Sequence, residues 1–373
     1  MPLDAADEAR LHEALALAEQ AVGLSDPNPR VGCVLAAPDG RVLGTGFTRQ
    51  AGGPHAEVVA LQAARAAGHQ LRGATAWVSL EPCAHHGRTP PCCDALIAAG
   101  VARVVAALGD PNPRVAGQGF ARLRAAGVSV ELAAPDSAVA VAARELNIGF
   151  LTRMARGRPW VRLKVAASLD GRTALVNGAS RWITGEAARA DGRAWRRRAA
   201  AVLTGVGTVR DDDPRLDVRE PATAWQPLRV VADSALRTPP AARILAPPGQ
   251  VLIAHAVDAA AAPAAAALQA RGAALCRLPA ADGRIDLDAL LAELARREIN
   301  ELHVEAGRTL NGALLRAGLV DELLLYLAPL LIGAGRELAA LGPFDALADA
   351  LRWRFVAVDR VGDDLRLRAR RSG

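Results

Sequence analysis

The sequence predicts an α/β fold divided into two domains. Short stretches rich in valine, leucine and isoleucine alternate with alanine-rich segments of helical length, and this alternation is typical of layered α/β proteins. At 373 residues the chain is also long for one core, since a domain usually takes about 100–200 residues. A stretch rich in arginine, glycine and proline at 152–159 interrupts the alternation. We therefore expect one domain at residues 1–150 and a second at 159–373.

The first domain is expected to begin with an amphipathic helix and to continue as alternating strands and helices. The apolar residues that recur at helical spacing behind an acidic first turn are Leu11, Leu15, Ala18 and Val22. Strands are expected at 31–36, 42–47, 74–80, 103–108 and 128–132, and helices at 55–67 and 92–99. His55 and Cys92 then lie at helix starts, where partial positive charge favours thiolate over thiol.

The second domain is expected to contain a further series of strands, at 161–166, 201–203, 228–232, 251–255, 301–305 and 322–327. Near its end, segments 352–358 and 365–369 are expected to pair as a hairpin around Gly362-Asp363-Asp364, because turn residues separate two strand-like stretches. The two halves do not match each other, so no internal repeat is expected.

The composition is that of a soluble enzyme, with 51% apolar and 23% charged residues. Residues 1–8 have neither the basic region nor the apolar run of a signal peptide. The longest apolar stretch, 323–332, is too short to span a bilayer. Three of the five cysteines lie within 83–93, as metal ligands do, rather than in a disulfide framework. We expect a cytoplasmic protein that does not enter a membrane.

The basic charge indicates small phosphorylated ligands. The formal net charge is +6 and the pI about 9.7, but the basic residues are dispersed and all except Lys164 are arginines. The one dense cluster, Arg196-Arg197-Arg198, lacks a series of aromatic residues that could form a stacking platform for bases. Arginine side chains grip single phosphate groups in bidentate fashion. We therefore expect a phosphorylated substrate and a phosphate-bearing cofactor, and no nucleic acid.

Three short motifs in the first hundred residues predict a zinc-dependent deaminase: His55-Ala-Glu57, Glu81-Pro-Cys83 and Pro90-Pro-Cys92. Zinc takes one imidazole and two thiolates in such enzymes and keeps a fourth position for water. It lowers the pKa of that water, so that hydroxide is available to attack a ring carbon. A carboxylate that is not a ligand then carries protons to the leaving ammonia. Glu57, two residues after His55, has the position of that carboxylate.

Other interpretations use the same residues differently. Cysteines are often small buried apolar groups, but a proline directly before each of two cysteines, downstream of His-Ala-Glu, favours a metal site. A binding protein with a structural zinc has no use for the carboxylate of Glu57. A deaminase of nucleic-acid bases would share the motif, yet it leaves residues 160–373 unexplained. It also favours Cys-x-x-Cys, whereas eight residues separate Cys83 from Cys92 here.

Longer segments resemble the bifunctional riboflavin-biosynthesis deaminase/reductase family. Those at 79–92 (SLEPCAHHGRTPPC) and 26–32 (DPNPRVG) are similar to its deaminase half. Those at 162–174, 182–184, 208–214 and 304–310 are similar to its reductase half, in the same order. The resemblance runs from about Ala9 to the C-terminus. It implies a cytidine-deaminase-like three-layer α/β domain followed by a dihydrofolate-reductase-like α/β domain.

The resemblance also implies two consecutive reactions and two cofactors. The first is hydrolytic deamination of a diamino-phosphoribosylamino-pyrimidinone to the uracil, with Zn²⁺ held by His55, Cys83 and Cys92 and protons moved by Glu57. The second is NADPH-dependent reduction of the ribosyl group to the ribityl phosphate. The substrate is thus a phosphorylated pyrimidine, and we expect the chain to form a homo-oligomer.

Carried over position by position, the resemblance implies further contacts. In the deaminase half Asn28 hydrogen-bonds the pyrimidine, His85 and Arg88 hold its phosphate, and Thr48 stands where the family often has histidine. The implied NADP contacts are Ala166, Trp182, Thr208, Asp212, Ser234, Gly307, Arg308, Thr309 and Leu310. The implied substrate contacts of the reductase half are Ser180, Arg196, Leu216, Arg219 and Glu305, of which Arg196 and Arg219 suit a ribose phosphate.

Overall fold

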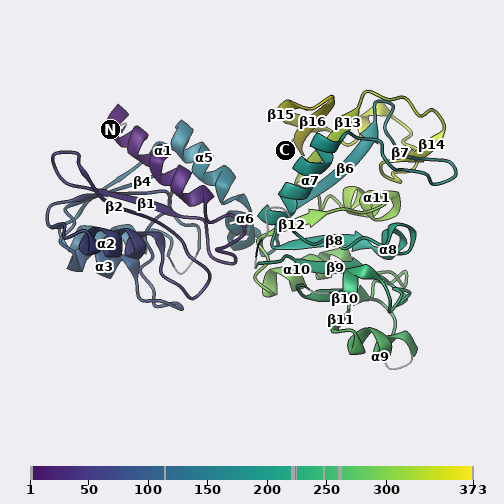
Figure 1. Ribbon diagram of the computed structural model, residues 1–373, viewed down its shortest axis with the longest axis horizontal. Coiled ribbons are helices and arrows are strands. Elements are labelled where there is room, and N and C mark those ends of the chain that lie inside the picture. Colours follow the sequence, from purple (N-terminus) through teal and green to yellow (C-terminus); the bar gives the residue numbers. More distant parts are fainter. Residues whose placement is uncertain are drawn as a thin grey trace. The chain divides into compact units, whose positions relative to one another are not determined.

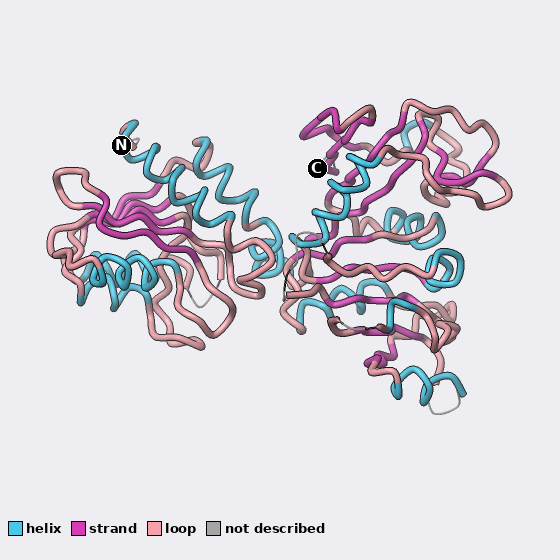
Figure 2. Tube along the Cα trace, viewed as in Figure 1, coloured by secondary structure: helices cyan, strands magenta, loops and turns pink. Residues whose placement is uncertain are grey.

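The computed structural model describes residues 3–112, 115–219, 223, 225–246, 248–258 and 263–371. The chain forms two compact units, Met1–Arg158 and Pro159–Gly373, whose helices and strands are drawn in Figure 1 and Figure 2. The boundary falls inside the arginine-, glycine- and proline-rich stretch at 152–159. Both units combine helices with strands, so the predicted α/β class is confirmed. Among the described residues, no helix has the length and apolar character needed to cross a bilayer.

The first unit is built on a five-stranded sheet in the order β2-β1-β3-β4-β5. Its strands are β1 (Gly32–Ala36), β2 (Val42–Phe47), β3 (Thr75–Val78), β4 (Arg103–Ala106) and β5 (Ser129–Leu132). β1 pairs antiparallel with β2 and with β3, while β3, β4 and β5 run parallel. Each strand lies within a segment that the sequence predicts to be one. β1 is buried along its whole length, as its unbroken apolar run indicates.

Helices cover both faces of this sheet and make the unit three-layered, as Figure 1 shows. They are α1 (Ala5–Glu19), α2 (Ala56–Ala66), α3 (Cys92–Ala98), α4 (Gln118–Ala125), α5 (Ala138–Leu146) and α6 (Ile148–Arg156). On one face α1 and α5 pack against Trp77 and Val105. On the other face α2, α3 and α4 pack against Val78 and Val104. Successive residues of one strand thus supply two separate apolar cores.

The close contact between α2 and β2 fixes where the first predicted metal ligand lies. A Cβ atom added to Gly46 would come within 2.4 Å of the Ala56 carbonyl oxygen. Only glycine allows a helix backbone to lie so near a strand. Because α2 begins at Ala56, His55 lies at its N-cap, next in the chain to this contact.

The second unit contains a nine-stranded sheet in the order β11-β10-β9-β8-β12-β6-β13-β16-β15. Its strands are β6 (Trp160–Ser168), β8 (Ala201–Gly205), β9 (Leu228–Ala232), β10 (Val251–His255), β11 (Ala273–Arg277), β12 (Glu301–Val304), β13 (Glu322–Ala328), β15 (Trp353–Val361) and β16 (Asp364–Arg371). Neighbours from β11 to β13 are parallel. The predicted terminal hairpin is confirmed as β15 and β16, which join β13 in antiparallel fashion.

Helices lie on both faces of the nine-stranded sheet. They are α7 (Glu186–Arg198), α8 (Val206–Asp212), α9 (Pro263–Ala270), α10 (Leu287–Arg296) and α11 (Arg308–Arg316). Helices α10 and α11 pack with the main apolar core, which includes Leu163, Leu203 and Val304. Helix α7 lies over the opposite face, where Leu324 and Tyr326 meet it. A small sheet of β7 (Arg172–Leu175) and β14 (Gly335–Glu337) completes the described strands.

The sheet face under α7 carries buried charges beside its small apolar cluster. Arg162 of β6 is 1% exposed; its Nη1 lies 2.8 Å from Glu301 Oε2 of β12 and its Nε 2.6 Å from Glu322 Oε1 of β13. Isolated buried charges are very costly, so such groups persist only when each is paired. The parallel alignment of β6, β12 and β13 brings these residues together.

Candidate functional site

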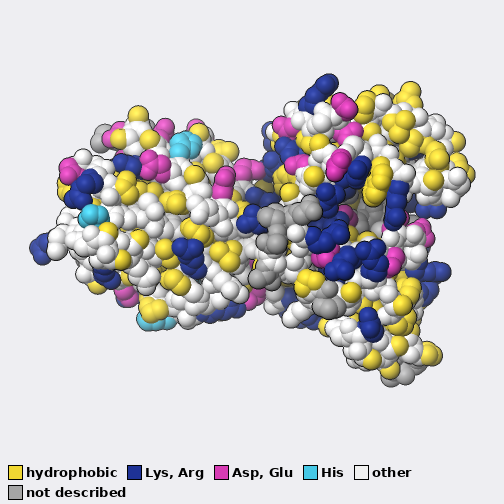
Figure 3. Space-filling model, viewed as in Figure 1, with side chains coloured by type: hydrophobic (Ala, Val, Ile, Leu, Met, Phe, Trp, Pro, Cys, Tyr) yellow, Lys and Arg dark blue, Asp and Glu magenta, His cyan; other side chains and the backbone are white. Residues whose placement is uncertain are grey.

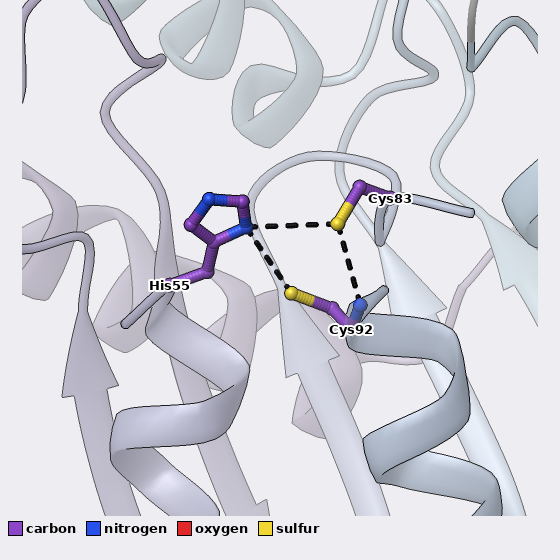
Figure 4. A group of neighbouring side chains, drawn as sticks. All are labelled: His55, Cys83 and Cys92. Carbon is purple, nitrogen blue, oxygen red and sulfur yellow. Dashed lines mark hydrogen bonds between the residues drawn. The ribbon is translucent and has the colours of Figure 1, made fainter. Parts of the chain in front are cut away.

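Three side chains in the first unit form a group of metal-ligand type. His55 Nδ1, Cys83 Sγ and Cys92 Sγ all lie within 4.8 Å of one another, and they point toward one another in Figure 4. His55 Nδ1 is 3.2 Å from Cys92 Sγ and 3.6 Å from Cys83 Sγ. One imidazole and two thiols are donors that suit zinc and do not suit calcium or magnesium, which prefer oxygen. The structure thus brings the three predicted ligands together.

Helix starts hold two of these ligands and a loop holds the third. His55 caps α2, Cys92 is the first residue of α3, and Cys83 lies in the loop that follows β3. The Cys92 backbone N–H donates to Cys83 Sγ at 3.3 Å, and the Cys93 N–H donates to the Cys83 carbonyl at 3.2 Å. Hydrogen bonds from the Cys92 side chain and from His55 lower the pKa of Cys83 to about 4. The site therefore favours a thiolate, the form that binds metal.

Glu57 lies in the first turn of α2 and is 3% exposed. Burial, together with the negative charge of Cys83, raises the pKa of Glu57 to about 7. A carboxyl group with a pKa near neutrality can both accept and release a proton. Its two-residue distance from His55 along the chain thus places a proton-carrying group beside the ligands.

The other predicted contacts of the first unit lie in two loops. Asn28 is half-buried in a turn, where its N–H donates to the Ser25 carbonyl at 2.8 Å. His85 is half-buried and Arg88 exposed in the loop between the two cysteines. Thr48 is 2% exposed, and its hydroxyl accepts the Val31 N–H at 3.2 Å. That hydroxyl thus holds the backbone at Val31, directly before β1.

Glu81 has a role that the sequence did not reveal. Its carboxylate is 4% exposed and accepts the backbone N–H groups of Asp110 and Gly117 at 3.1 Å and of Phe120 at 3.2 Å. It thereby fastens the segment after β4 to the segment that carries Cys83. The sequence also contains a second copy of Asp-Pro-Asn-Pro-Arg-Val, at 110–115 as at 26–31. The expectation of no internal repeat is therefore wrong for this six-residue segment, which can be read directly from the sequence.

In the second unit, Arg196 and Glu305 form a two-point ion pair. Arg196 Nε is 2.5 Å from Glu305 Oε1, and Nη2 is 3.0 Å from Oε2. Arg196 Nη1 also donates to the Asp217 carbonyl at 3.3 Å. Burial alone would raise the pKa of Glu305, but the Arg196 charge and hydrogen bonds lower it well below its usual value. The structure thus pairs two residues that the sequence assigns separately to the substrate.

Lys164 is a further candidate that the sequence analysis missed. It lies on β6, with its Nζ 5.7 Å from the centre of the Tyr326 ring. A Cβ atom added to Gly192 of α7 would lie 3.3 Å from Lys164 Cε. Burial lowers the pKa of Lys164, against the opposing charge of Glu305. The available signal was its uniqueness, because it is the one lysine among 45 basic residues and it packs on the one tyrosine.

Five of the nine predicted cofactor residues lie at the starts of α8 and α11, just beyond the carboxyl ends of β8 and β12. Gly307 is the N-cap of α11, directly after β12, and a Cβ added there would lie 3.5 Å from Thr208 Oγ1 of α8. Leu310 packs next to Gly205, where β8 ends. Backbone N–H groups at the start of a helix favour anions. The structure therefore brings the turn Gly307 to Leu310 and Thr208 together.

The remaining predicted residues are more scattered. Trp182 is 68% exposed, and the Arg189 guanidinium lies 4.5 Å from its ring centre. Asp212 ends α8, Ala166 lies within β6, and Ser234 follows β9, while Ser180 is half-buried. Leu216 is buried in an apolar cluster, so its side chain packs in the core. Arg219 is 57% exposed, with Nε 3.3 Å from Asp217 Oδ1. Arginine side chains, dark blue in Figure 3, gather on the visible face of this unit.

Family models match both units. Residues 4–108 match the cytidine and deoxycytidylate deaminase zinc-binding region, and residues 159–367 match the RibD C-terminal domain. The second match accounts for the part of the chain that a deaminase of nucleic-acid bases left unexplained.

Curated relatives and solved structures match nearly the whole chain. The Escherichia coli riboflavin biosynthesis protein RibD is 46% identical over 96% of this chain and 98% of its own length, and the Haemophilus influenzae protein is 42% identical over 96% and 95%. The Acinetobacter baumannii RibD structure superposes with a TM-score of 0.88 at 41% identity, over 99% of each chain. A Thermotoga maritima deaminase/reductase gives 0.87 at 30% identity, over 98% and 99%. The chain therefore belongs to the RibD family of bifunctional deaminase/reductase enzymes of riboflavin biosynthesis.

Proposed function

We propose that the first unit hydrolytically deaminates a diamino-phosphoribosylamino-pyrimidinone and that the second reduces the ribosyl group of the product with NADPH. The observation that carries the proposal is the group of His55, Cys83 and Cys92 with buried Glu57 beside it. The name of the Thermotoga maritima protein, which includes both a phosphoribosylaminopyrimidine deaminase and a phosphoribosylaminouracil reductase, supports the order of the reactions.

In the deaminase site, His55, Cys83 and Cys92 would hold zinc. When bound, zinc would lower the pKa of a water in its open fourth position and make hydroxide available near neutral pH. Glu57 accepts a proton from the attacking water and delivers it to a ring nitrogen, and it then transfers the second proton of that water to the departing amine. Its burial suits this task, because a carboxylate with an ordinary pKa is a poor proton donor at neutral pH.

The loops around the ligands would bind the rest of the substrate. Asn28 offers an amide that can donate to and accept from the pyrimidine edge. His85 and Arg88 supply N–H donors for the phosphate from the loop between the two cysteines. A phosphate held there ties substrate binding to the same segment that carries the metal ligands.

In the reductase site, NADPH would supply the hydride, and the residues of the chain bind and orient the reactants. The turn Gly307, Arg308, Thr309 and Leu310 and the neighbouring Thr208 would hold a cofactor phosphate. The other residues assigned to the cofactor are Ala166, Trp182, Asp212 and Ser234. Ser180 and the backbone of Leu216 would contact the substrate.

The arginines of this site take different roles. The guanidinium of Arg196 donates hydrogen bonds to Glu305 and to the Asp217 carbonyl, so we assign Arg196 to holding Glu305 in place. Arg219 is largely exposed, and we assign it to the ribose phosphate. Glu305 and Lys164 then face the ribosyl group from adjacent parallel strands, where they can bind its hydroxyl groups and position a proton.

One experiment tests both halves. The diaminopyrimidine phosphate is supplied to the protein with and without NADPH, and the products are identified by mass. We expect the deaminated product alone without NADPH and the deaminated, reduced product with it. Reduction without prior deamination, or no deamination by zinc-loaded protein, would contradict the proposal.

We also propose a cytoplasmic location and a homo-oligomer. Cys83 and Cys92 must stay reduced to bind metal, which favours a reducing compartment. Strand β15 lies at the edge of the nine-stranded sheet, and its Phe355 and Val358 are each 60% exposed. An exposed apolar edge strand is suited to pairing with a second chain. Light scattering tests this, and Phe355→Lys should shift an oligomer toward monomer, whereas a monomeric wild-type protein would refute it.

A further inference from the structure

Thr89 lies against the ring nitrogen of His55 that faces away from the two cysteines. Its Oγ1 is 3.4 Å from His55 Nε2. His55 Nδ1, in contrast, is 3.2 Å from Cys92 Sγ and 3.6 Å from Cys83 Sγ, and Figure 4 shows both cysteines on that side of the ring. The imidazole thus has one nitrogen directed at the thiols and the other at a hydroxyl group.

We infer that Thr89 is a positioning residue of the metal site, because its hydroxyl accepts the Nε2–H of His55 and leaves the Nδ1 lone pair free for the metal. The inference rests on the proposed zinc site. A neutral imidazole carries one proton, so a hydrogen-bond acceptor at Nε2 selects the tautomer whose Nδ1 can bind a cation. Metal-binding histidines usually donate their second N–H to such a partner.

The local sequence makes Thr89 stiff. Pro90 follows it, and a following proline confines the backbone to extended conformations. The branched Cβ of threonine restricts its first side-chain torsion. The Gly87 N–H also donates to the Thr89 carbonyl at 3.2 Å, which closes a turn within the loop. The hydroxyl is therefore held near His55 with little further loss of side-chain entropy.

This role gives the eight residues between Cys83 and Cys92 a second task. His85 and Arg88 of the same loop are assigned to the substrate phosphate, and neither explains why the loop approaches His55. Thr89 is half-buried, and its hydroxyl is directed at a ligand of the metal. A loop that also supports the metal would tolerate fewer substitutions than one that binds the phosphate alone.

Three full-length variants separate these roles. Thr89→Val keeps the shape of the side chain and removes the acceptor, and Thr89→Ser keeps the hydroxyl. Thr45→Val is the matched control, because Thr45 is an exposed threonine of β2. The zinc affinity of metal-free protein is measured by competition with a chromophoric chelator, and the visible spectrum with Co²⁺ reports the ligand geometry.

We expect Thr89→Val to weaken zinc binding about 10–100-fold, as loss of such a partner typically does. Thr89→Ser and Thr45→Val should bind zinc like the wild-type protein. Circular dichroism and NADPH oxidation with pre-deaminated substrate check folding. If Thr89→Val does not fold, Thr89→Ala carries the same expectation.

Wild-type zinc affinity in the folded Thr89 variants that lack the hydroxyl would overturn the inference, in either of two cases. With an unchanged KM, Thr89 would have no role in the site; with a raised KM, Thr89 would contact the substrate instead. Failure of the proposed zinc site is distinguishable from both, since Cys92→Ser would then bind zinc as tightly as the wild-type protein.

Discussion

The two units carry their chemistry in different ways. In the first, His55, Cys83 and Cys92 each stand in a short motif, and the fold brings their ligand atoms within 4.8 Å of one another. In the second, Arg196, Glu305 and Lys164 do not form a motif along the chain, and they lie together because α7 and the parallel strands β6 and β12 align them. A metal centre requires particular types of ligand residue. Hydride transfer requires only that side chains hold the substrate and cofactor in the right positions, because the cofactor carries the reactive group. The first kind of site is therefore readable from sequence and the second is not.

Metal removal should give the largest difference between the units. The described ligand group lies wholly in the first unit, so chelation should abolish ammonia release from the diaminopyrimidine. NADPH oxidation with pre-deaminated substrate should continue at its original rate. Ammonia and NADPH assays on one chelated sample test this, and returned zinc should restore deamination. Equal loss of both activities in folded protein would show that the sites are not independent.

Glu57→Gln should give the next largest effect. Glutamine keeps the size of the side chain but cannot carry a proton, and general acid–base groups contribute about 10²–10⁴-fold in rate. We expect at least that loss in kcat for deamination, with zinc content and reductase activity unchanged. Glu19→Gln, at an exposed position of α1, is the matched control. Loss of zinc would instead make Glu57 a ligand, and near-normal deamination would remove it from the mechanism.

The buried charges of the second unit should make its stability depend on pH in the acidic range. Burial alone would raise the pKa of Glu322, but the Arg162 and Arg368 charges lower it to about 2, from an ordinary value of 4.5. Because the folded pKa is the lower one, the stabilisation is complete above pH 4.5 and is lost as pH falls toward 2. The difference corresponds to about 3 kcal/mol.

Glu322→Gln tests this dependence. The protein is incubated in urea at each pH and then returned to neutral pH, and the loss of NADPH oxidation reports unfolding of the second unit. The variant should be less stable than the wild-type protein at pH 7. Its stability should also change less between pH 4.5 and pH 2 than that of the wild-type protein. A variant with wild-type acid dependence would mean that other carboxylates control the unfolding.

The sequence predicted most of the sheet because most strands are buried apolar stretches. It missed β7 and β14, which are short and contain Arg172, Arg336 and Glu337. These two strands are held by pairing with each other, as in Gly335 with Leu175. Such pairing could not be predicted because the two segments have no apolar pattern typical of strands. It also missed β11, at the edge of the nine-stranded sheet.

The candidate sites show the same division. The ligand group and Glu57 could be named because their spacing along the chain is itself the signal. The pairing of Arg196 with Glu305 could not, because it joins residues 109 positions apart, and long-range contacts of this kind depend on how the parallel strands are ordered. Glu81 was visible in its motif, but its backbone partners lie in a different loop.

The smallest expected effect distinguishes the two arginines of the second site. Arg219 is 57% exposed and shares Asp217 with Arg215, so its contact with phosphate is screened by water and lies at the weak end of the 1.5–3 kcal/mol typical of charged hydrogen bonds. Arg219→Ala should raise the reductase KM about tenfold with kcat unchanged. Arg196→Ala should instead lower kcat, because it frees Glu305 from its two-point contact. Steady-state kinetics of both variants decide this, with Arg271→Ala, an exposed arginine after α9, as the control. If both variants changed KM alone, Arg196 would bind phosphate as the resemblance implies, and its contact with Glu305 would have to open when substrate enters.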